Sequence, residues 1–156
     1  MTSNLILSPY TADSTLIASS QLTGLSNGGY ASAGVGTPTP YNNTAGKPYF
    51  RARLILPSAV TAGTSAPFVG VYAIPSLAGD GAAYPDPPGL AAEACPAQYH
   101  IGNILPVAGA SFTSGILNTA VLEPNWYLFV LLNELGVGFP SGTVSFIGNS
   151  FSEQAG

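Results

Sequence analysis

Charged residues are the scarcest part of this sequence. Lys and Arg total 3 and Asp and Glu total 7 in 156 residues, so charged side chains make up 6% of the chain. An ordinary soluble domain carries roughly 25%. The net charge of −4 lacks the basic excess of a nucleic-acid-binding domain, so no nucleic-acid partner is expected. Because the centres of protein interfaces are depleted in charge, the shortage favours a surface that meets other subunits, including copies of itself in a homo-oligomer. A polar but uncharged free surface is the alternative.

Cysteine and long apolar runs are also lacking. Cys95 is the single cysteine, which excludes an internal disulfide. One cysteine and one histidine cannot supply a closed zinc site. Uncharged stretches such as residues 104–122 contain Pro106 and Gly109, so no membrane-spanning helix is expected. The N-terminal residues have no basic region before their short apolar run, and no secretory signal is predicted.

What the sequence does contain is short β-prone segments between glycines and prolines. Residues 126–132 form an unbroken apolar and aromatic run that is too short for a typical helix, which predicts a strand covered on both faces. Residues 143–147 alternate and predict its return strand. We interpret the connecting turn as a finger with Phe139 at its tip. With so little charge elsewhere, the second covering of the central strand is expected to be another subunit.

Further strands follow from the same signals, with almost no helix between them. About eight or nine short strands with turn signals predict an all-β fold, an antiparallel, jelly-roll-like β-sandwich with long Gly/Pro-rich loops. We expect a single domain over residues 1–156, with 26–45 an extended loop or arm and 149–156 a polar C-terminal tail. The other expected elements are strands or β-prone pieces at 5–7, 15–18, 21–25, 49–56, 68–74, 98–105 and 111–122, and one helical turn at 90–95.

Enzymatic motifs are weak. Residues 24–28 fit G-x-S-x-G, and Ser26 precedes Asp80 or Asp86 and then His100 in the order of an α/β-hydrolase triad. That motif needs a helix directly after the serine, and the glycines that follow Ser26 exclude one. A Cys95–His100 pair lacks an orienting third group. Asp80 and Asp86 lie in Gly/Pro loops without regular ligand spacing, so a cation there stays open. We therefore predict no enzyme, no cofactor and no metal.

Interface candidates come from the basic and aromatic residues. Every basic residue of the chain falls between Lys47 and Arg53, and Arg51 shares a strand face with Arg53. Such a cluster predicts either local ion pairs or a docking patch for an acidic partner surface, where Arg is favoured. Loop and tail aromatics could anchor a protein interface or stack on sugars. The expected contact residues are Tyr30, Tyr41, Lys47, Arg51, Arg53, Phe139 and Phe151.

Two stretches carry a resemblance to a known family. The pattern from about residue 90 to residue 152, above all 127–131 with Asn133, Gly136 and 142–144, resembles the small cement or decoration proteins of tailed-phage capsids. The entry into a strand at 46–53 is also similar. The resemblance implies a β-sandwich or jelly roll, many copies on the capsid surface of the virion, and a non-enzymatic role in locking subunits of the major capsid protein together. The long arm at 26–45 and the very low charge depart from the family. The alternative is a carbohydrate- or receptor-binding β-sandwich of a phage tail or fibre.

Overall fold

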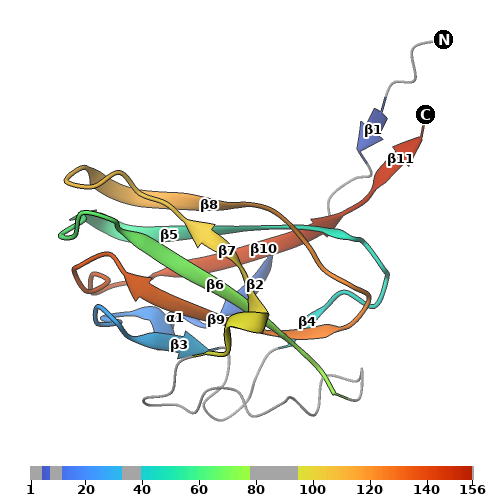
Figure 1. Ribbon diagram of the computed structural model, residues 1–156, viewed down its shortest axis with the longest axis horizontal. Coiled ribbons are helices and arrows are strands. Elements are labelled where there is room, and N and C mark those ends of the chain that lie inside the picture. The colour runs from blue at the N-terminus through green and yellow to red at the C-terminus, as the bar shows by residue number, and fades with distance from the viewer. Residues whose placement is uncertain (1–4, 8–11, 33–39, 78–94, 156) are drawn as a thin grey trace.

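Two antiparallel sheets face each other in this computed structural model, which describes the backbone of residues 5–7, 12–32, 40–77 and 95–155 (Figure 1). Sheet I has the strand order β2-β10-β5-β8, and sheet II has the order β3-β9-β6-β7 with β4 also beside β9. Two short helices, α1 (Ser19–Leu22) and η1 (Ala97–Tyr99), connect strands. The strands of sheet I are β2 (Ser14–Ile17), β5 (Tyr49–Thr61), β8 (Ser111–Val121) and β10 (Ser145–Phe151). Those of sheet II are β3 (Tyr30–Ser32), β4 (Tyr41–Asn42), β6 (Phe68–Pro75), β7 (His100–Ile104) and β9 (Trp126–Glu134).

The strand pairs are nested along the chain. β6 pairs with β7, β5 with β8, β3 with β9, and β2 with β10, each antiparallel. The outermost pair joins β1 (Leu5–Leu7) to β11 (Glu153–Ala155), and this ribbon projects from the sandwich (Figure 1). One long antiparallel ribbon, rolled so that β10 also meets β5 and β9 also meets β6, gives this arrangement. The predicted jelly-roll-like β-sandwich is therefore confirmed.

Aromatic side chains from both sheets fill the centre of the sandwich. Phe50 of β5 stacks on Phe129 of β9 with ring centroids 4.9 Å apart. Tyr41 of β4 meets both rings edge-on, at 5.3 Å and 5.8 Å, and Phe146 of β10 lies 6.3 Å from Phe129. Such tilted and stacked pairs add to the free energy gained by burying the rings. The predicted inward face of β5 is correct, because Phe50, Ala52, Leu54 and Leu56 are all buried.

Several predicted boundaries need correction. β5 continues past Pro57 to Thr61 with a register shift between Ile55 and Val60, because a proline is tolerated at such an irregularity. The β-prone piece predicted at 21–25 overlaps a helix, because α1 spans residues 19–22. The polar tail expected at 149–156 is corrected over residues 149–155, since Asn149–Phe151 complete β10 and β11 follows. Residues 26–45 include β3 and β4, both paired with β9. The expected helical turn at 90–95 lies almost wholly outside the described residues.

Candidate functional site

The outer face of sheet II is covered within the chain. Tyr72 and Ile74 lie opposite Val130 and Leu128 in the register, on the face away from the aromatic centre, and all four are buried. The Tyr72 ring lies 6.3 Å from that of Tyr30 and 5.1 Å from that of His100. The doubly covered strand at 126–132 is thus confirmed. Its second covering by another subunit is wrong, because this single chain already buries it.

The outer face of sheet I is open by contrast. Arg53 is exposed, and Tyr49, Arg51 and Ile55 are partly exposed on the same face of β5. On the neighbouring β8, Ile116 opposite Arg53 and Val121 opposite Tyr49 are 59% and 70% exposed. Large apolar side chains beside arginines on one open sheet face are typical of a surface that binds another protein.

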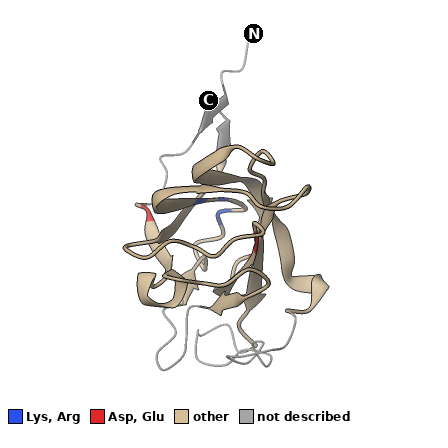
Figure 2. Ribbon diagram, turned by 90° about the vertical axis from the view of Figure 1, so that its left-hand side faces the viewer, with Lys and Arg blue, Asp and Glu red and all other residues tan. Residues whose placement is uncertain are grey.

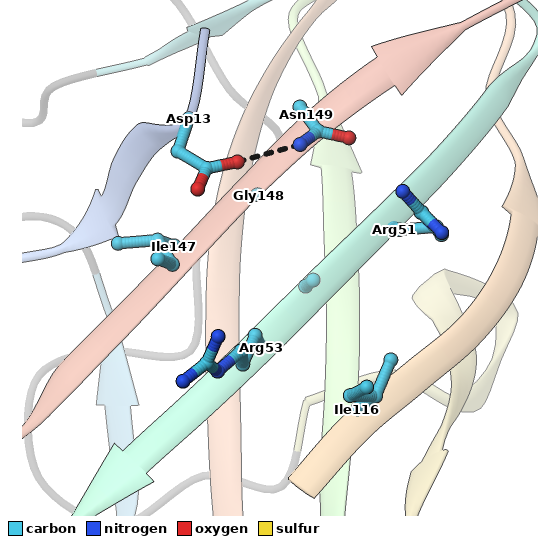
Figure 3. A pocket seen from close by; sticks show the side chains of 8 residues that line it. Asp13, Arg51, Arg53, Ile116, Ile147, Gly148 and Asn149 are labelled. Atoms are coloured by element: carbon cyan, nitrogen blue, oxygen red, sulfur yellow. Dashed lines mark hydrogen bonds between the residues drawn. The ribbon is translucent and has the colours of Figure 1, made fainter. Parts of the chain in front are cut away.

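A depression of about 250 Å³ lies in this face (Figure 3). Its floor is the backbone around Ala52 and Gly148, which pair with each other across β5 and β10. Two cross-strand rows form its walls, one with Arg51 opposite Asn149 and the other with Ile116, Arg53 and Ile147 side by side. Residues two apart on a strand are about 7 Å apart, which sets the spacing between the two rows. Asp13, just before β2, closes its far end.

An unpaired acceptor lies in the wall of the depression. Asn149 donates through Nδ2 to Asp13 Oδ1 at 2.5 Å, while its own Oδ1 is buried without a hydrogen-bond partner. The orientation of the amide is fixed because an ionised carboxylate can only accept, so Nδ2 must face Asp13. Leaving a buried acceptor unpaired costs about 1–3 kcal/mol.

The basic residues concentrate positive charge beside the depression. In Figure 2 the Lys and Arg positions lie together, whereas the described Asp and Glu positions lie apart from one another. Arg51 places its guanidinium carbon 5.4 Å from the centre of the Phe151 ring, which itself stacks on Tyr49 at 5.4 Å. Such a cation–π contact holds the arginine in place. In a chain of net charge −4, this face is the part that attracts an acidic group.

The aromatic contact candidates are mostly internal. Tyr41, expected in a surface arm, is 7% exposed and shares a hydrogen bond with Ser150 inside the sandwich. Phe139, the expected fingertip, is 3% exposed. Its turn folds back on residues 25–28, with Phe139 N–H donating to Leu25 O at 2.9 Å and Asn133 Nδ2 to Leu25 O and Val137 O. Both expectations of a surface contact are wrong for this reason.

The remaining candidates differ in exposure. Phe151 is also buried, beneath Arg51, so it supports the face without being a free anchor. Tyr30 is half-buried over Tyr72 on the other sheet. Lys47 is half-buried in the turn before β5. The structure therefore brings Arg51 and Arg53 together in one site and leaves Tyr30, Tyr41 and Phe139 apart from it.

Four residues of the depression were missed by sequence reasoning. These are Asp13, Ile116, Ile147 and Asn149. The alternation of residues 145–151 could have found two of them, since Ile147 and Asn149 share its partly exposed face with Ser145. The predicted tail beginning at residue 149 hides this alternation. Asp13 and Ile116 depend on pairings that the sequence does not display.

The described candidate catalytic groups differ in exposure, with Ser26 and His100 exposed and Cys95 buried. Ser26 lies in turns between α1 and β3, so a strand, not a helix, follows it. Burial raises the pKa of the Cys95 thiol to about 11, which suppresses the thiolate. His100 is exposed, with Nε2 2.8 Å from Asn103 Oδ1. Within the described residues, no three His, Cys, Asp or Glu side chains gather as a metal site would require. Asp80 and Asp86 lie outside the described residues.

The fold and this face define a class: an antiparallel β-sandwich with one sheet covered by its own chain and one open, apolar and basic sheet. Comparisons with protein-family models, with curated proteins and with solved structures find no match. Neither short helix of the described chain approaches the length and hydropathy needed to cross a membrane.

Proposed function

We propose that the protein is a non-enzymatic structural protein of a virion, a capsid decoration or cement protein that binds neighbouring subunits of the major capsid protein. The observation that carries the proposal is the asymmetry of the sandwich. Sheet II is buried by its own chain, while sheet I presents Ile116, Val121 and Arg53 to solvent. A protein that binds the assembled capsid and not the free subunits stabilises the assembly by mass action.

Two further features support this role. Jelly rolls recur in viral capsids and in lectins, although a fold alone does not determine function. The projecting β1–β11 ribbon supplies an arm that can reach beyond the sandwich (Figure 1). Copies of the chain are a second proposed partner in a homo-oligomer, through surfaces other than the open face of sheet I. A two-fold contact centred on Arg51 and Arg53 would place arginines against arginines, which is unfavourable.

Cosedimentation with capsids that lack decoration tests the proposal. The purified protein should be retained on the particles and should raise their disruption temperature. Ile116→Ser with Val121→Ser should weaken retention about tenfold or more, since fully burying each apolar side chain contributes about 1.5–3 kcal/mol. Val107→Ser is the matched control, because Val107 is 73% exposed in the turn between β7 and β8 and lies outside sheet I. A purified protein that shows no affinity for such capsids would contradict the proposal.

The glycan-binding alternative loses support from burial. It depends on exposed loop aromatics, and Tyr41 and Phe139 are both buried, while Tyr84 lies outside the described residues. A glycan array that shows specific binding to the wild-type protein would reverse this preference.

A further inference from the structure

We propose that two copies of the chain pair edge to edge through β8, antiparallel about a two-fold axis at Ile116, so that sheet I continues from one copy into the other. The partner at this surface is a second copy of this chain. The inference deepens the homo-oligomer part of the proposed function and rests on that part alone, because the pairing requires no capsid protein.

The outer edge of β8 lacks the features that keep the sheets of separate proteins apart. β8 ends the strand order of sheet I along the upper margin of the sandwich, and among the described strands of that sheet it pairs with β5 alone (Figure 1). Edge strands of natural proteins are commonly short or carry charges and prolines. β8 has 11 residues, and Ser111–Val121 contains neither a charged residue nor a proline. The outer row of its backbone N–H and C=O groups therefore suits pairing with another strand.

The burial pattern of β8 is symmetric about Ile116. Phe112 and Ala120 are both buried, and Ser111 and Val121 are both exposed. A two-fold axis at Ile116 sets residue 112 against residue 120 and residue 111 against residue 121, so buried side chains meet buried ones and exposed side chains meet exposed ones. A strand that matches its own copy in this way favours a second copy over an unrelated segment.

The irregularities of β8 follow the same symmetry. Its pairing with β5 shifts register between Phe112 and Ser114 and again between Leu117 and Ala120. Bulges can blunt the edge of a sheet, but these two shifts fall on either side of Ile116. The two-fold axis therefore sets one shifted region against the other and leaves residues 114–117 regular at its centre.

The side chains of the open face are compatible with this pairing. Ile116 is 59% exposed, and on the axis it lies opposite the second copy's Ile116, with about 5 Å between their Cβ atoms. Arg53 lies opposite Ile116 on β5, so three strand spacings, about 14 Å, separate the two Arg53 residues. That distance exceeds the Debye length of about 8–10 Å. Edge pairing thus avoids the repulsion that a contact centred on the arginines would cause.

Sedimentation equilibrium of the full-length protein over a concentration series tests the inference without capsids. The wild-type protein should form a dimer. Ile116→Lys should raise the dissociation constant of the dimer about tenfold or more, because the axis sets the two introduced charges directly opposite each other and removes an apolar pair. An equimolar mixture of Ile116→Lys and Ile116→Glu should associate again, since opposite charges then face each other. Val107→Lys is the matched control, because Val107 is 73% exposed in the turn between β7 and β8 and should change the dissociation constant by less than about twofold.

Oxidation of Ile116→Cys in a Cys95→Ala background gives an independent readout. Opposed residues of antiparallel strands have Cα atoms about 4.5–5.5 Å apart, which is within the range of a disulfide. The covalent dimer should therefore form fast with Ile116→Cys and slowly with Val107→Cys, although Val107 is the more exposed of the two positions.

Three outcomes would overturn the inference. These are a wild-type protein that stays monomeric up to about 1 mM, a dimer that Ile116→Lys and Val107→Lys weaken equally, and a mixture of the two Ile116 variants that fails to associate. Capsid retention separates this failure from that of the proposed capsid role. A monomeric wild-type protein that capsids retain would sink the inference alone, whereas a dimer that capsids do not retain would sink the capsid role alone.

Discussion

The side chain of Asn133 joins two loops of this protein through hydrogen bonds. Asn133, at the end of β9, is fully buried and bonds on both sides of its amide. Nδ2 donates to Leu25 O at 3.0 Å and Val137 O at 2.9 Å, and Oδ1 accepts from the Leu135 N–H at 3.1 Å. Because buried backbone groups need partners, this one side chain ties the turn at 136–142 to the loop at 25–29.

Asn133→Ala should therefore destabilise the protein strongly. It leaves two carbonyls and one N–H without these partners, and we expect a loss of about 2–4 kcal/mol in the free energy of unfolding. Chemical denaturation measures it. Asn42→Ala is the control, since the Asn42 hydrogen bonds to Thr44 are exposed and should contribute less than about 1 kcal/mol. Equal losses in the two variants would contradict this account.

Cys95 should make stability depend on alkaline pH. Burial raises the pKa of its thiol from 9.0 to about 11. Between these values the unfolded chain has lost a proton that the folded chain retains, so the free energy of unfolding falls as pH rises through this window. Burial also raises the pKa of Tyr72 and Tyr127, which adds to the fall above pH 10.

Denaturation of wild type and Cys95→Ala across this pH range measures the effect. The fall should be smaller in the variant, because Ala does not titrate. Parallel pH profiles would show that Cys95 does not contribute. The folded wild-type protein should also react slowly with a thiol reagent near neutral pH, since the thiolate is the nucleophile.

At the scale of elements, the sequence predicted where strands form better than it predicted which strands pair. The unbroken run at 126–132 and the alternation at 49–56 reflect local burial, and both strands formed, although β5 extends past its predicted end to Thr61. β3 and β4 have only 3 and 2 residues. They form because they pair with β9, and the local sequence gives no signal of that pairing. The arginine pair was visible in the sequence, but the depression was not, because its walls are joined by pairings between β5, β8 and β10.

The packing of β7 against β8 depends on Gly115. A Cβ at this position would lie 2.2 Å from Ile104 Cγ2 and 3.0 Å from Phe112 Cε2. Gly115→Ala should cost about 1–3 kcal/mol through overpacking. The cost should shrink in an Ile104→Ala background, because the clashing methyl group is then absent.

Thermal or chemical unfolding of the two single variants and the double variant measures this coupling. Gly138→Ala is the matched control, since a Cβ there would meet nothing closer than Leu25 O at 3.5 Å. Additive losses at Gly115 and Ile104 would contradict the proposed contact.

At the scale of the whole molecule, the sandwich and the terminal ribbon are separable. β1 pairs with β11 and with no other described strand, and an isolated two-stranded ribbon is marginally stable. Deletion of residues 1–7 should thus change the free energy of unfolding by less than about 1 kcal/mol, whereas Phe146→Ala in the core should cost about 3–5 kcal/mol. A deletion as costly as the core substitution would show that the ribbon supports the sandwich. Retention of the deletion variant on capsids then reports whether the ribbon serves as an arm.

The nested pairing also sets the order in which a ribosome can complete the protein. Ile17 pairs with Phe146, and Tyr30 with Leu132, so β2 and β3 find these partners only after more than 100 further residues have been translated. The loops that these pairs close are long, and long-range pairing of this kind is slow. The nascent chain must therefore carry its apolar N-terminal strands unpaired through most of translation, when exposed strand edges are prone to aggregate. We infer that the sandwich closes only after β10 has emerged from the ribosome, since β2 has its partner there.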